Sequence, residues 1–348
     1  MTDLRERLQA ILGAAYRIER ELGGGGMSRV FLAEEVRLGR QVVVKVLPPE
    51  MAAGVSVDRF EREIHLAAKL QHPHIVPLLT AGSDGDLLYY IMPRVEGQSL
   101  RVRLAHEHEL PIAEAVRILR DVCDALAYAH GHGIVHRDIK PDNVLLSGKH
   151  SLVTDFGVAK AVAQSTDSTA LTSIGMALGT PAYMAPEQAA GDPGTDHRAD
   201  IYAVGALAYE MLAGRPPFTA AGVQAVLAAH MSTPPDPVTK YRESVAPQLA
   251  ALVMRCLAKH PADRFQSANE VLHELEQLVT PTGGITATMP APFEALAAAE
   301  RGHPVRVAGL FALGSAAVLG FVYFLTNQLG LPAWVLRAAI GLLAVGLP

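Results

Sequence analysis

The most constraining feature of this chain is a polar stretch between residues 136 and 157. It contains His136-Arg137-Asp138-Ile139-Lys140-Pro141-Asp142-Asn143 and then Asp155-Phe156-Gly157. A candidate base, a lysine and two metal-ligating side chains therefore lie close together in the sequence. Phosphoryl transfer needs such a set, because a nucleotide's terminal phosphate is highly charged and the protein must supply cations and a positioned proton acceptor. The stretch predicts transfer of a phosphoryl group to a hydroxyl.

Length, charge and cysteine content narrow the possible partners. The 348 residues suffice for one large domain or two smaller ones. A formal net charge of −5 argues against a broad nucleic-acid-binding surface. Cys123 and Cys256 are too far apart for a metal-binding or redox spacing, so we expect free thiols in a reducing compartment. The N-terminus lacks an apolar run after a basic start, which argues against a cleaved signal peptide and predicts that residues 1–300 stay in the cytoplasm.

The periodicity of the chain changes along its length. Residues 1–15 are expected to form a short amphipathic leader helix. Residues 16–47 alternate in the manner of β-strands, and residues 57–70 have a helical period. Helices and loops dominate from about residue 99 to 278. A small β-rich part followed by a larger helical part predicts two lobes with a cleft between them.

The C-terminal part of the chain is expected to lie in a membrane. Val307–Leu325 is an uncharged apolar run long enough to cross a bilayer, which predicts a transmembrane helix over residues 305–326. Arg301 and Arg306 flank its N-terminal side, so the positive-inside rule places the preceding domain in the cytoplasm. The alternative interpretation of this run is a buried core helix.

Two further segments flank the predicted membrane helix. Residues 279–304 are rich in Thr, Pro and Gly and predict a flexible juxtamembrane linker. Residues 331–348 form a second apolar run, interrupted by Arg337, and predict a second, truncated span. We therefore expect a protein of the inner (cell) membrane with one or two passes and a cytoplasmic catalytic domain.

Two features upstream of the polar stretch fit a nucleotide site. Glycines in Leu22-Gly23-Gly24-Gly25-Gly26-Met27-Ser28-Arg29-Val30 would let backbone N–H groups approach phosphate oxygens closely, although any hairpin turn can be glycine-rich. Lys45 lies within the apolar strand Val42-Val43-Val44-Lys45-Val46-Leu47, an unusual position for a purely structural lysine. Alone, it would be interpreted as an edge-strand lysine that reaches solvent.

Taken together, residues 16–278 resemble a protein kinase and are most similar to bacterial membrane-anchored Ser/Thr kinases of the eukaryotic-like type. H-R-D-x-x-x-x-N and D-F-G resemble the catalytic and metal loops, and residues 179–187 resemble the end of an activation segment. The resemblance implies an α+β, bilobal fold: a small antiparallel sheet with one helix over residues 16–93, and a larger, mainly helical lobe over residues 97–278. It also implies ATP and Mg²⁺ as cofactors and protein substrates with Ser or Thr acceptors.

The resemblance assigns roles to individual residues. Asp138 would orient the substrate hydroxyl and accept its proton, and Lys140 would steady the transferred phosphate. Asn143 and Asp155 would hold Mg²⁺ through hard oxygen ligands. The expected nucleotide-binding residues are Leu22, Gly23, Gly24, Gly25, Gly26, Met27, Ser28, Val30, Val43, Lys45, Met92, Pro93 and Val95, together with Asn143 and Asp155.

By the same resemblance, Lys45 would contact the α- and β-phosphates and form an ion pair with a glutamate of the following helix. Two candidates exist, Glu61 and Glu63. We predict Glu63, because it lies on the same helix face as Ala67 and Leu70.

Other motif residues are expected to be structural. His136 would pack against Phe156 rather than act as a base. Glu187 would form a buried ion pair with Arg264, and Asp200, at the start of a helix, would brace the catalytic loop.

The activation segment is expected to be a switch. Arg137 beside Asp138 implies control by phosphorylation, because a phosphate opposite an arginine forms charge-assisted hydrogen bonds and orders a loop. Lys140 and Thr180 are typical of Ser/Thr specificity. The candidate autophosphorylation sites are Thr172 first, then Thr169 and Ser173.

Two other functions compete with that of a protein kinase. A membrane-tethered pseudokinase scaffold would be favoured by loss of Lys45, Asp138 or Asp155, all of which are present. A small-molecule kinase of the antibiotic-phosphotransferase type shares the catalytic loop but should lack residues 179–187 and Arg264. A homodimer is implied by the resemblance alone.

Overall fold

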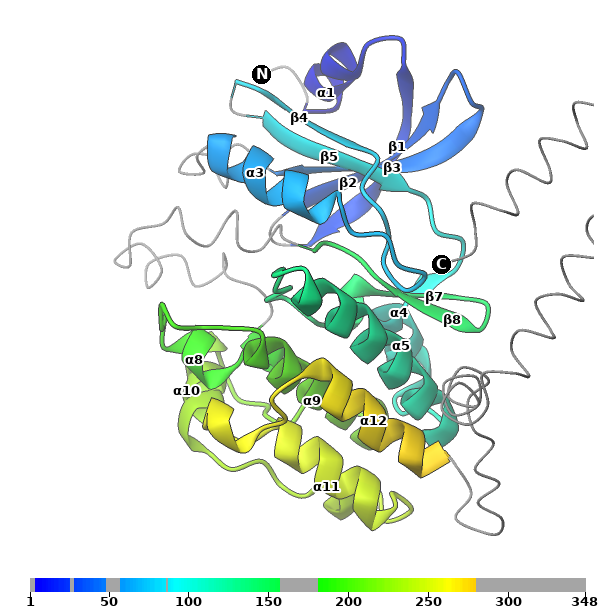
Figure 1. Ribbon diagram of the computed structural model, residues 1–348. Helices are drawn as coiled ribbons and strands as arrows, with labels where there is room; N and C mark the ends of the chain where they lie inside the picture. The colour runs from blue at the N-terminus through cyan, green and yellow to red at the C-terminus, as the bar shows by residue number, and fades with distance from the viewer. Residues whose placement is uncertain (1–3, 26–27, 48–56, 86, 157–180, 280–348) are drawn as a thin grey trace, which may run out of the picture. The chain divides into compact units, whose positions relative to one another are not determined.

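The computed structural model describes residues 4–25, 28–47, 57–85, 87–156 and 181–279, all within the unit Met1–Pro281 (Figure 1). Among these residues, no helix is both long and apolar enough to cross a membrane. Both predicted spans and residues 280–304 of the predicted linker lie outside the described residues. The same holds for Gly26, Met27, Thr169, Thr172, Ser173 and Thr180.

Five antiparallel strands form the first sheet, in the order β1-β2-β3-β5-β4. Its strands are β1 (Tyr16–Gly25), β2 (Ser28–Glu35), β3 (Arg40–Leu47), β4 (Thr80–Asp84) and β5 (Leu87–Pro93). Strand β3 shows why the sequence forms this sheet. Val42, Val44 and Val46 are fully buried on one face, whereas Val43 and Lys45 alternate with them on the other.

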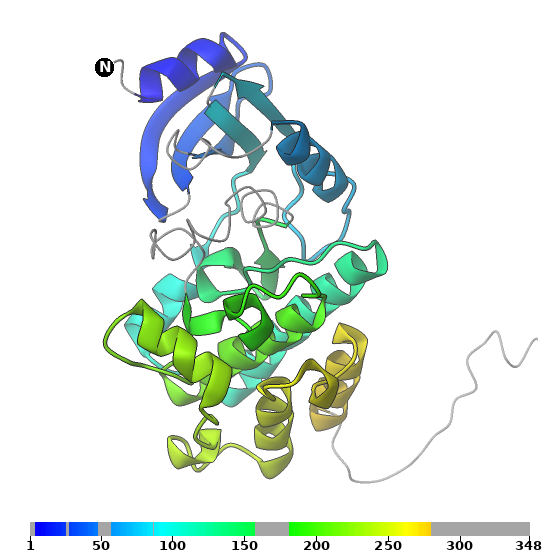
Figure 2. The ribbon, with the colours of Figure 1, turned by 90° about the vertical axis from the view of Figure 1, so that its left-hand side faces the viewer.

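Two helices cover opposite faces of this sheet. Helix α1 (Leu4–Leu12) places Leu8 and Leu12 in the cluster that contains the buried valines of β3. Helix α3 (Val57–Ala67) places Phe60 and Ile64 in a second cluster on the opposite face. Figures 1 and 2 show the sheet between these two helices. The sheet lobe therefore has three layers, and its two faces have separate apolar clusters.

A mainly helical part follows the sheet. Its helices are α4 (Leu100–Glu107), α5 (Ile112–Gly131), α8 (Pro186–Ala189), α9 (Arg198–Ala213), α10 (Val223–Ser232), α11 (Pro247–Cys256) and α12 (Ala268–Val279). Helix α9 is buried from Ala199 to Leu212, as expected for a helix that is apolar on nearly all sides. It ends at Ala213 and is capped by Gly214, whose φ of +71° is left-handed. This helix forms the centre of the hydrophobic core of the helical part.

A second, three-stranded sheet includes two strands from the polar stretch at residues 136–157. Its strands are β6 (Gln98–Ser99), β7 (Val144–Ser147) and β8 (His150–Val153), in that order. The Val76 N–H donates to the Val153 carbonyl at 2.9 Å, and the Val153 N–H donates to the His74 carbonyl at 2.8 Å. These bonds tie β8 to the segment between α3 and β4. The residues that follow β8 are thereby fixed close to the first sheet.

The predicted antiparallel-sheet lobe and helical lobe are thus both confirmed. The amphipathic helix expected within residues 1–15 spans Leu4–Leu12. The transmembrane helix stays a prediction.

Candidate active site

The loop at residues 136–143 is held from below by one buried carboxylate. Asp200, in the first turn of α9, is fully buried and accepts hydrogen bonds from the backbone N–H groups of His136 at 2.8 Å and Arg137 at 2.7 Å. The His130 ring donates a third bond from Nε2 at 2.8 Å. Arg137 has a φ of +67°, a conformation that a non-glycine residue keeps only when its surroundings impose it. Asp200 supplies that constraint.

The pKa of Asp200 reflects this arrangement. Burial by itself would raise the pKa of the Asp200 carboxyl. The hydrogen bond and charge of His130, together with the charge and the backbone hydrogen bond of His136, lower this pKa below its ordinary value. The carboxylate is therefore charged in the folded protein at neutral pH. Its three donors compensate the cost of burying that charge.

His136 joins the loop at residues 136–143 to the segment after β8. Its ring lies 4.6 Å from the Phe156 ring, centroid to centroid, in an edge-on arrangement. Nδ1 accepts a bond from the Asp138 N–H at 3.2 Å, so the proton is on Nε2, which donates to the Thr154 carbonyl at 2.8 Å. Both ring nitrogens are thus used within the protein. This buried histidine has the contacts of a structural residue, and the structure brings it together with Phe156.

Three polar side chains of this loop lie close together: those of Asp138, Lys140 and Asn143. Lys140 Nζ lies 2.7 Å from Asp138 Oδ2. The Asn143 side-chain amide donates to the Asp138 carbonyl at 2.8 Å and to Oδ2 at 3.1 Å. A carboxylate, a cation and an amide are therefore within hydrogen-bonding reach of one another. The Asn143 amide oxygen, which is not used in these bonds, has the chemistry of a metal ligand.

Lys45 and Asp155 connect the two parts of the fold. Lys45 Nζ donates to Asp155 Oδ2 at 2.5 Å, and the Tyr90 hydroxyl donates to Asp155 Oδ1 at 2.8 Å. Asp155 also has a positive φ, +69°. Burial alone would raise its pKa, but the charge of Lys45 and hydrogen bonds from Lys45 and Tyr90 lower it below the ordinary carboxyl range.

The predicted ion pair between Lys45 and Glu63 stays a prediction. The described ion pair of Lys45 is with Asp155. Glu63 is 8% exposed on α3. The other candidate, Glu61, accepts a bond from the Ser83 hydroxyl at 3.1 Å. The pair with Asp155 is strong because the carboxylate is desolvated and lies 2.5 Å away, and attraction between charges grows as distance and dielectric fall.

Tyr90 is the residue that sequence analysis missed. In the register of the sheet it lies directly opposite Lys45. Its hydroxyl is buried, which together with the charge of Asp155 raises the pKa of Tyr90 well above its ordinary value. The alternation of β5 (LLYYIMP) could have placed one of its two tyrosines on the same face as Lys45. Choosing Tyr90 over Tyr89 required the register.

Most of the described nucleotide-contacting candidates lie in the same sheet as Lys45 and Tyr90. Val43 lies opposite Met92, and Val42 lies opposite Pro93, at the end of β5. Val95 packs against the cluster that contains Met92. In the hairpin of β1 and β2, the partners of Gly23, Gly24 and Gly25 are Val30, Arg29 and Ser28, respectively. Gly23 has a φ of +119°, a backbone conformation that favours glycine. Leu22, immediately before it, is exposed.

The residues present fit a Mg²⁺–nucleotide complex. No group of three or more His, Cys, Asp or Glu side chains that could hold a metal occurs among the described residues. Mg²⁺ is commonly held by one or two protein oxygens together with substrate phosphates, so Asn143 and Asp155 are a sufficient protein contribution. Lys45 adds a cation for the phosphates.

Two sets of buried polar contacts hold residues 183–187 against the helical lobe. The Tyr183 hydroxyl bonds to Glu210 of α9, and the Arg101 guanidinium of α4 bonds to both residues, with Nη1 at 2.8 Å from Glu210 Oε1. Arg264 donates two bonds to Glu187, at 2.6 and 2.7 Å, and is fully buried. The structure thus brings the predicted Glu187–Arg264 pair together.

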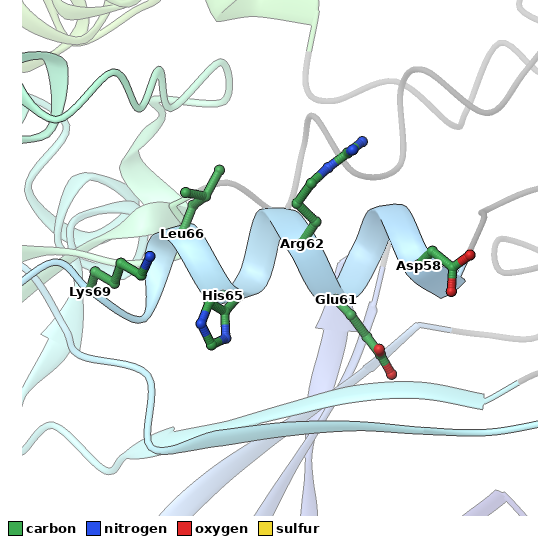
Figure 3. A pocket seen from close by; sticks show the side chains of 6 residues that line it. All are labelled: Asp58, Glu61, Arg62, His65, Leu66 and Lys69. Carbon is green, nitrogen blue, oxygen red and sulfur yellow. The ribbon is translucent and has the colours of Figure 1, made fainter.

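Two surface hollows lie away from these residues. One, of about 520 Å³, follows the exposed side of α3 and is shown in Figure 3. It is lined by Asp58, Glu61, Arg62, His65, Leu66 and Lys69. The other, of about 420 Å³, lies beside β6 and β7. Its lining residues are Gly97, Gln98, Arg103, Glu114, Arg117, Leu146 and Gly148. Neither contains a residue predicted to bind nucleotide.

Comparison with known proteins identifies the family to which this fold and site belong. The family model of the protein kinase domain matches residues 16–275, and the chain belongs to this family. The family uses ATP and Mg²⁺. Within this family, the chain is similar to bacterial serine/threonine-protein kinases.

Over 270 residues, the chain is 40% identical to serine/threonine-protein kinase PknB of Mycobacterium leprae, covering 76% of this chain and 43% of that protein. It is 39% identical over 270 residues to PknB of Mycobacterium tuberculosis, with the same coverage, 76% and 43%. It is also 38% identical over 278 residues to a probable serine/threonine-protein kinase PknB of Corynebacterium glutamicum, covering 77% and 43%. The chain thus spans less than half the length of these relatives.

Proposed function

We propose that this chain is a serine/threonine protein kinase, which transfers the γ-phosphate of ATP to Ser or Thr hydroxyls of proteins. The convergence of Asp138, Lys140 and Asn143, with Asp155 and Lys45 beside them, is the observation that carries the proposal. The similarity to kinases named for serine/threonine activity supports the choice of acceptor. Lys140, which is typical of Ser/Thr specificity, also favours Ser or Thr as the acceptor.

The residues divide the chemistry between them. Asp138 accepts the proton of the substrate hydroxyl as its oxygen bonds to phosphorus and the bond to the ADP oxygen breaks. Lys140 and Lys45 stabilise negative charge on the phosphates. Asn143 and Asp155 hold Mg²⁺, which supplies further positive charge to the phosphate oxygens. Because Lys140 already contacts Asp138, the base and the phosphate-binding cation are positioned as a unit.

The decisive experiment compares the purified wild type with Asp138→Asn. We expect ATP-dependent phosphorylation of a generic protein substrate by the wild type and a loss of about 10²- to 10⁴-fold in the variant. ATP binding without phosphoryl transfer by the wild type would favour the pseudokinase scaffold. Transfer to small molecules but not to protein would favour the phosphotransferase alternative.

Autophosphorylation of the activation segment is the second part of the proposal. Arg137 Nη2 donates to the Thr195 carbonyl at 3.1 Å, while its buried Nε has no hydrogen-bond partner among the described residues. A guanidinium with an unused donor suits a phosphorylated side chain. We propose Thr172 as the first site, then Thr169 and Ser173. Peptide mapping after incubation with ATP should find phosphate there, and phosphate confined to residues 279–304 would contradict this.

We further propose that residues 305–326 anchor the kinase to the inner membrane, with the catalytic domain in the cytoplasm. The apolar run Val307–Leu325 and the arginines before it support this. The full chain should sediment with membranes and resist extraction by alkaline carbonate, whereas a chain ending at residue 304 should not. Release of the full chain by carbonate would contradict membrane anchoring.

A further inference from the structure

Helix α1 lies outside the region matched by the kinase family, yet it is built into the sheet lobe. The family match begins at residue 16, whereas α1 spans Leu4–Leu12. Leu8 is fully buried and Leu12 nearly so, in one cluster with Phe31 of β2. Figure 2 shows α1 lying across the sheet. Without α1, the face of the sheet that it covers would expose a continuous apolar surface.

The covered face is the back of the strand that carries Lys45. Side chains alternate along a strand, so Val44 and Val46, on either side of Lys45, point to the opposite face. Both are fully buried in the cluster that contains Leu8 and Leu12. Packing by α1 therefore restrains β3 from behind, while Lys45 faces the nucleotide site.

Gln9 of α1 acts as an additional strand partner for β1. Strand β1 is at the edge of the sheet, so one of its sides has no neighbouring strand in the part of the chain that the structure describes. Gln9 Nε2 donates to the Tyr16 carbonyl at 2.9 Å, and Gln9 Oε1 accepts a bond from the Ile18 N–H at 2.8 Å. A carbonyl and the N–H two residues later point to the same side of a strand. The side-chain amide thus takes the place of a backbone peptide group.

Three further bonds extend this contact. Gln9 Nε2 also donates to the Gly13 carbonyl at 3.1 Å, which closes the turn between α1 and β1. Arg5 Nη2 donates to the carbonyls of Ile18 at 3.3 Å and Glu19 at 3.0 Å. The edge of β1 is therefore bonded to α1 from Tyr16 to Glu19, just before the strand reaches its glycines.

We propose that α1 is a positioning element of the nucleotide site, and that Gln9 is a positioning residue for β1 and the glycine turn that follows. This inference rests on the proposed function, because it assigns nucleotide contact to that turn. Gln9 touches neither nucleotide nor substrate. It acts by fixing the direction in which β1 enters residues 22–25, and α1 packing fixes β3 in the same way.

The test uses the full chain with Gln9→Met, which keeps the length of the side chain and removes its hydrogen bonds. We expect KM for ATP to rise about threefold to tenfold, the range that one or two net hydrogen bonds represent, with kcat nearly unchanged. Hydrogen exchange at the Ile18 amide should become faster. Glu6→Gln, on the exposed side of the same helix, is the matched control and should change neither quantity.

The outcomes separate this inference from the proposed function. Assays are run well below the unfolding midpoint of each variant, so that a change in global stability does not alter KM. Unchanged KM and unchanged Ile18 exchange in Gln9→Met would overturn the positioning role. A wild type that transfers no phosphate would overturn the proposed function, whereas a kinase-active wild type with a normal Gln9→Met variant would overturn only this inference.

Discussion

Lys45 and Asp155 are 110 positions apart in the sequence, yet Lys45 Nζ lies 2.5 Å from Asp155 Oδ2. This ion pair joins the central strand of the first sheet to the segment after β8. The Tyr90 hydroxyl completes the arrangement by bonding the second carboxylate oxygen. The candidate phosphate-binding cation and the candidate metal-binding carboxylate thus pair directly, and the second oxygen of the carboxylate accepts a bond from a tyrosine that the sequence motifs did not predict.

The bond from Tyr90 to Asp155 should contribute measurably to stability. Tyr90→Phe removes one donor from a buried, charged carboxylate, and we expect the free energy of unfolding to fall by about 1.5–3 kcal/mol. Urea denaturation measures the change. Tyr89→Phe, at the neighbouring position of β5 on the other face, is the control and should shift the unfolding free energy by less than about 0.5 kcal/mol. Equal effects of the two variants would show that the hydroxyl bond to Asp155 contributes little.

The buried pair of Glu187 and Arg264 should be essential for folding stability. Glu187→Gln leaves the fully buried Arg264 guanidinium without its charge partner, so we expect a loss of about 3–5 kcal/mol. The exposed pair of Lys240 and Asp236 offers a contrast, and Lys240→Ala should leave the urea midpoint unchanged within error. A small effect of Glu187→Gln would mean that the backbone carbonyls around Arg264 suffice to hold it.

Asp200 should make stability depend on acid pH. Its pKa in the folded protein lies below the ordinary value of 3.8, so its contribution is fully present above about pH 4 and is lost as the pH falls through the folded pKa. We expect Asp200→Asn to be destabilised by about 2–4 kcal/mol at pH 7, since three donors lose their carboxylate. The difference in unfolding free energy between this variant and the wild type should narrow as the pH falls from 5 to 3. Urea midpoints measured across that range test this, and a constant difference would exclude Asp200 as the cause.

Gly97 should tolerate no side chain. Its φ is +135°, and a Cβ at this position would lie 1.9 Å from the Leu146 carbonyl oxygen. We expect Gly97→Ala to cost more than about 2 kcal/mol, because both the backbone conformation and the contact oppose it. Gly148 has a φ of +57° with no atom within 4 Å of its would-be Cβ, so Gly148→Ala should cost only about 1 kcal/mol. Similar thermal midpoints for the two variants would contradict the steric argument.

Much of this fold could be predicted because its signals are local. Alternation in Val42–Leu47 predicts a strand with Lys45 on the face opposite Val44, and the structure has that arrangement. The apolar spacing of residues 1–15 predicts an amphipathic helix. The two hydrogen bonds of Gln9 to the edge of β1 could not be predicted, because they depend on how α1 crosses that edge.

The order of motifs in the sequence by itself determined the class of site: a base, two cations and two metal ligands for phosphoryl transfer. These are properties of side-chain chemistry and spacing, and a linear pattern carries them. Only the tertiary structure decided that Lys45 pairs with Asp155. An ion pair depends on distance and burial in space, and the segment after β8 brings Asp155 to 2.5 Å from Lys45. The same packing selected Tyr90 over Tyr89 and made α1 part of the sheet lobe.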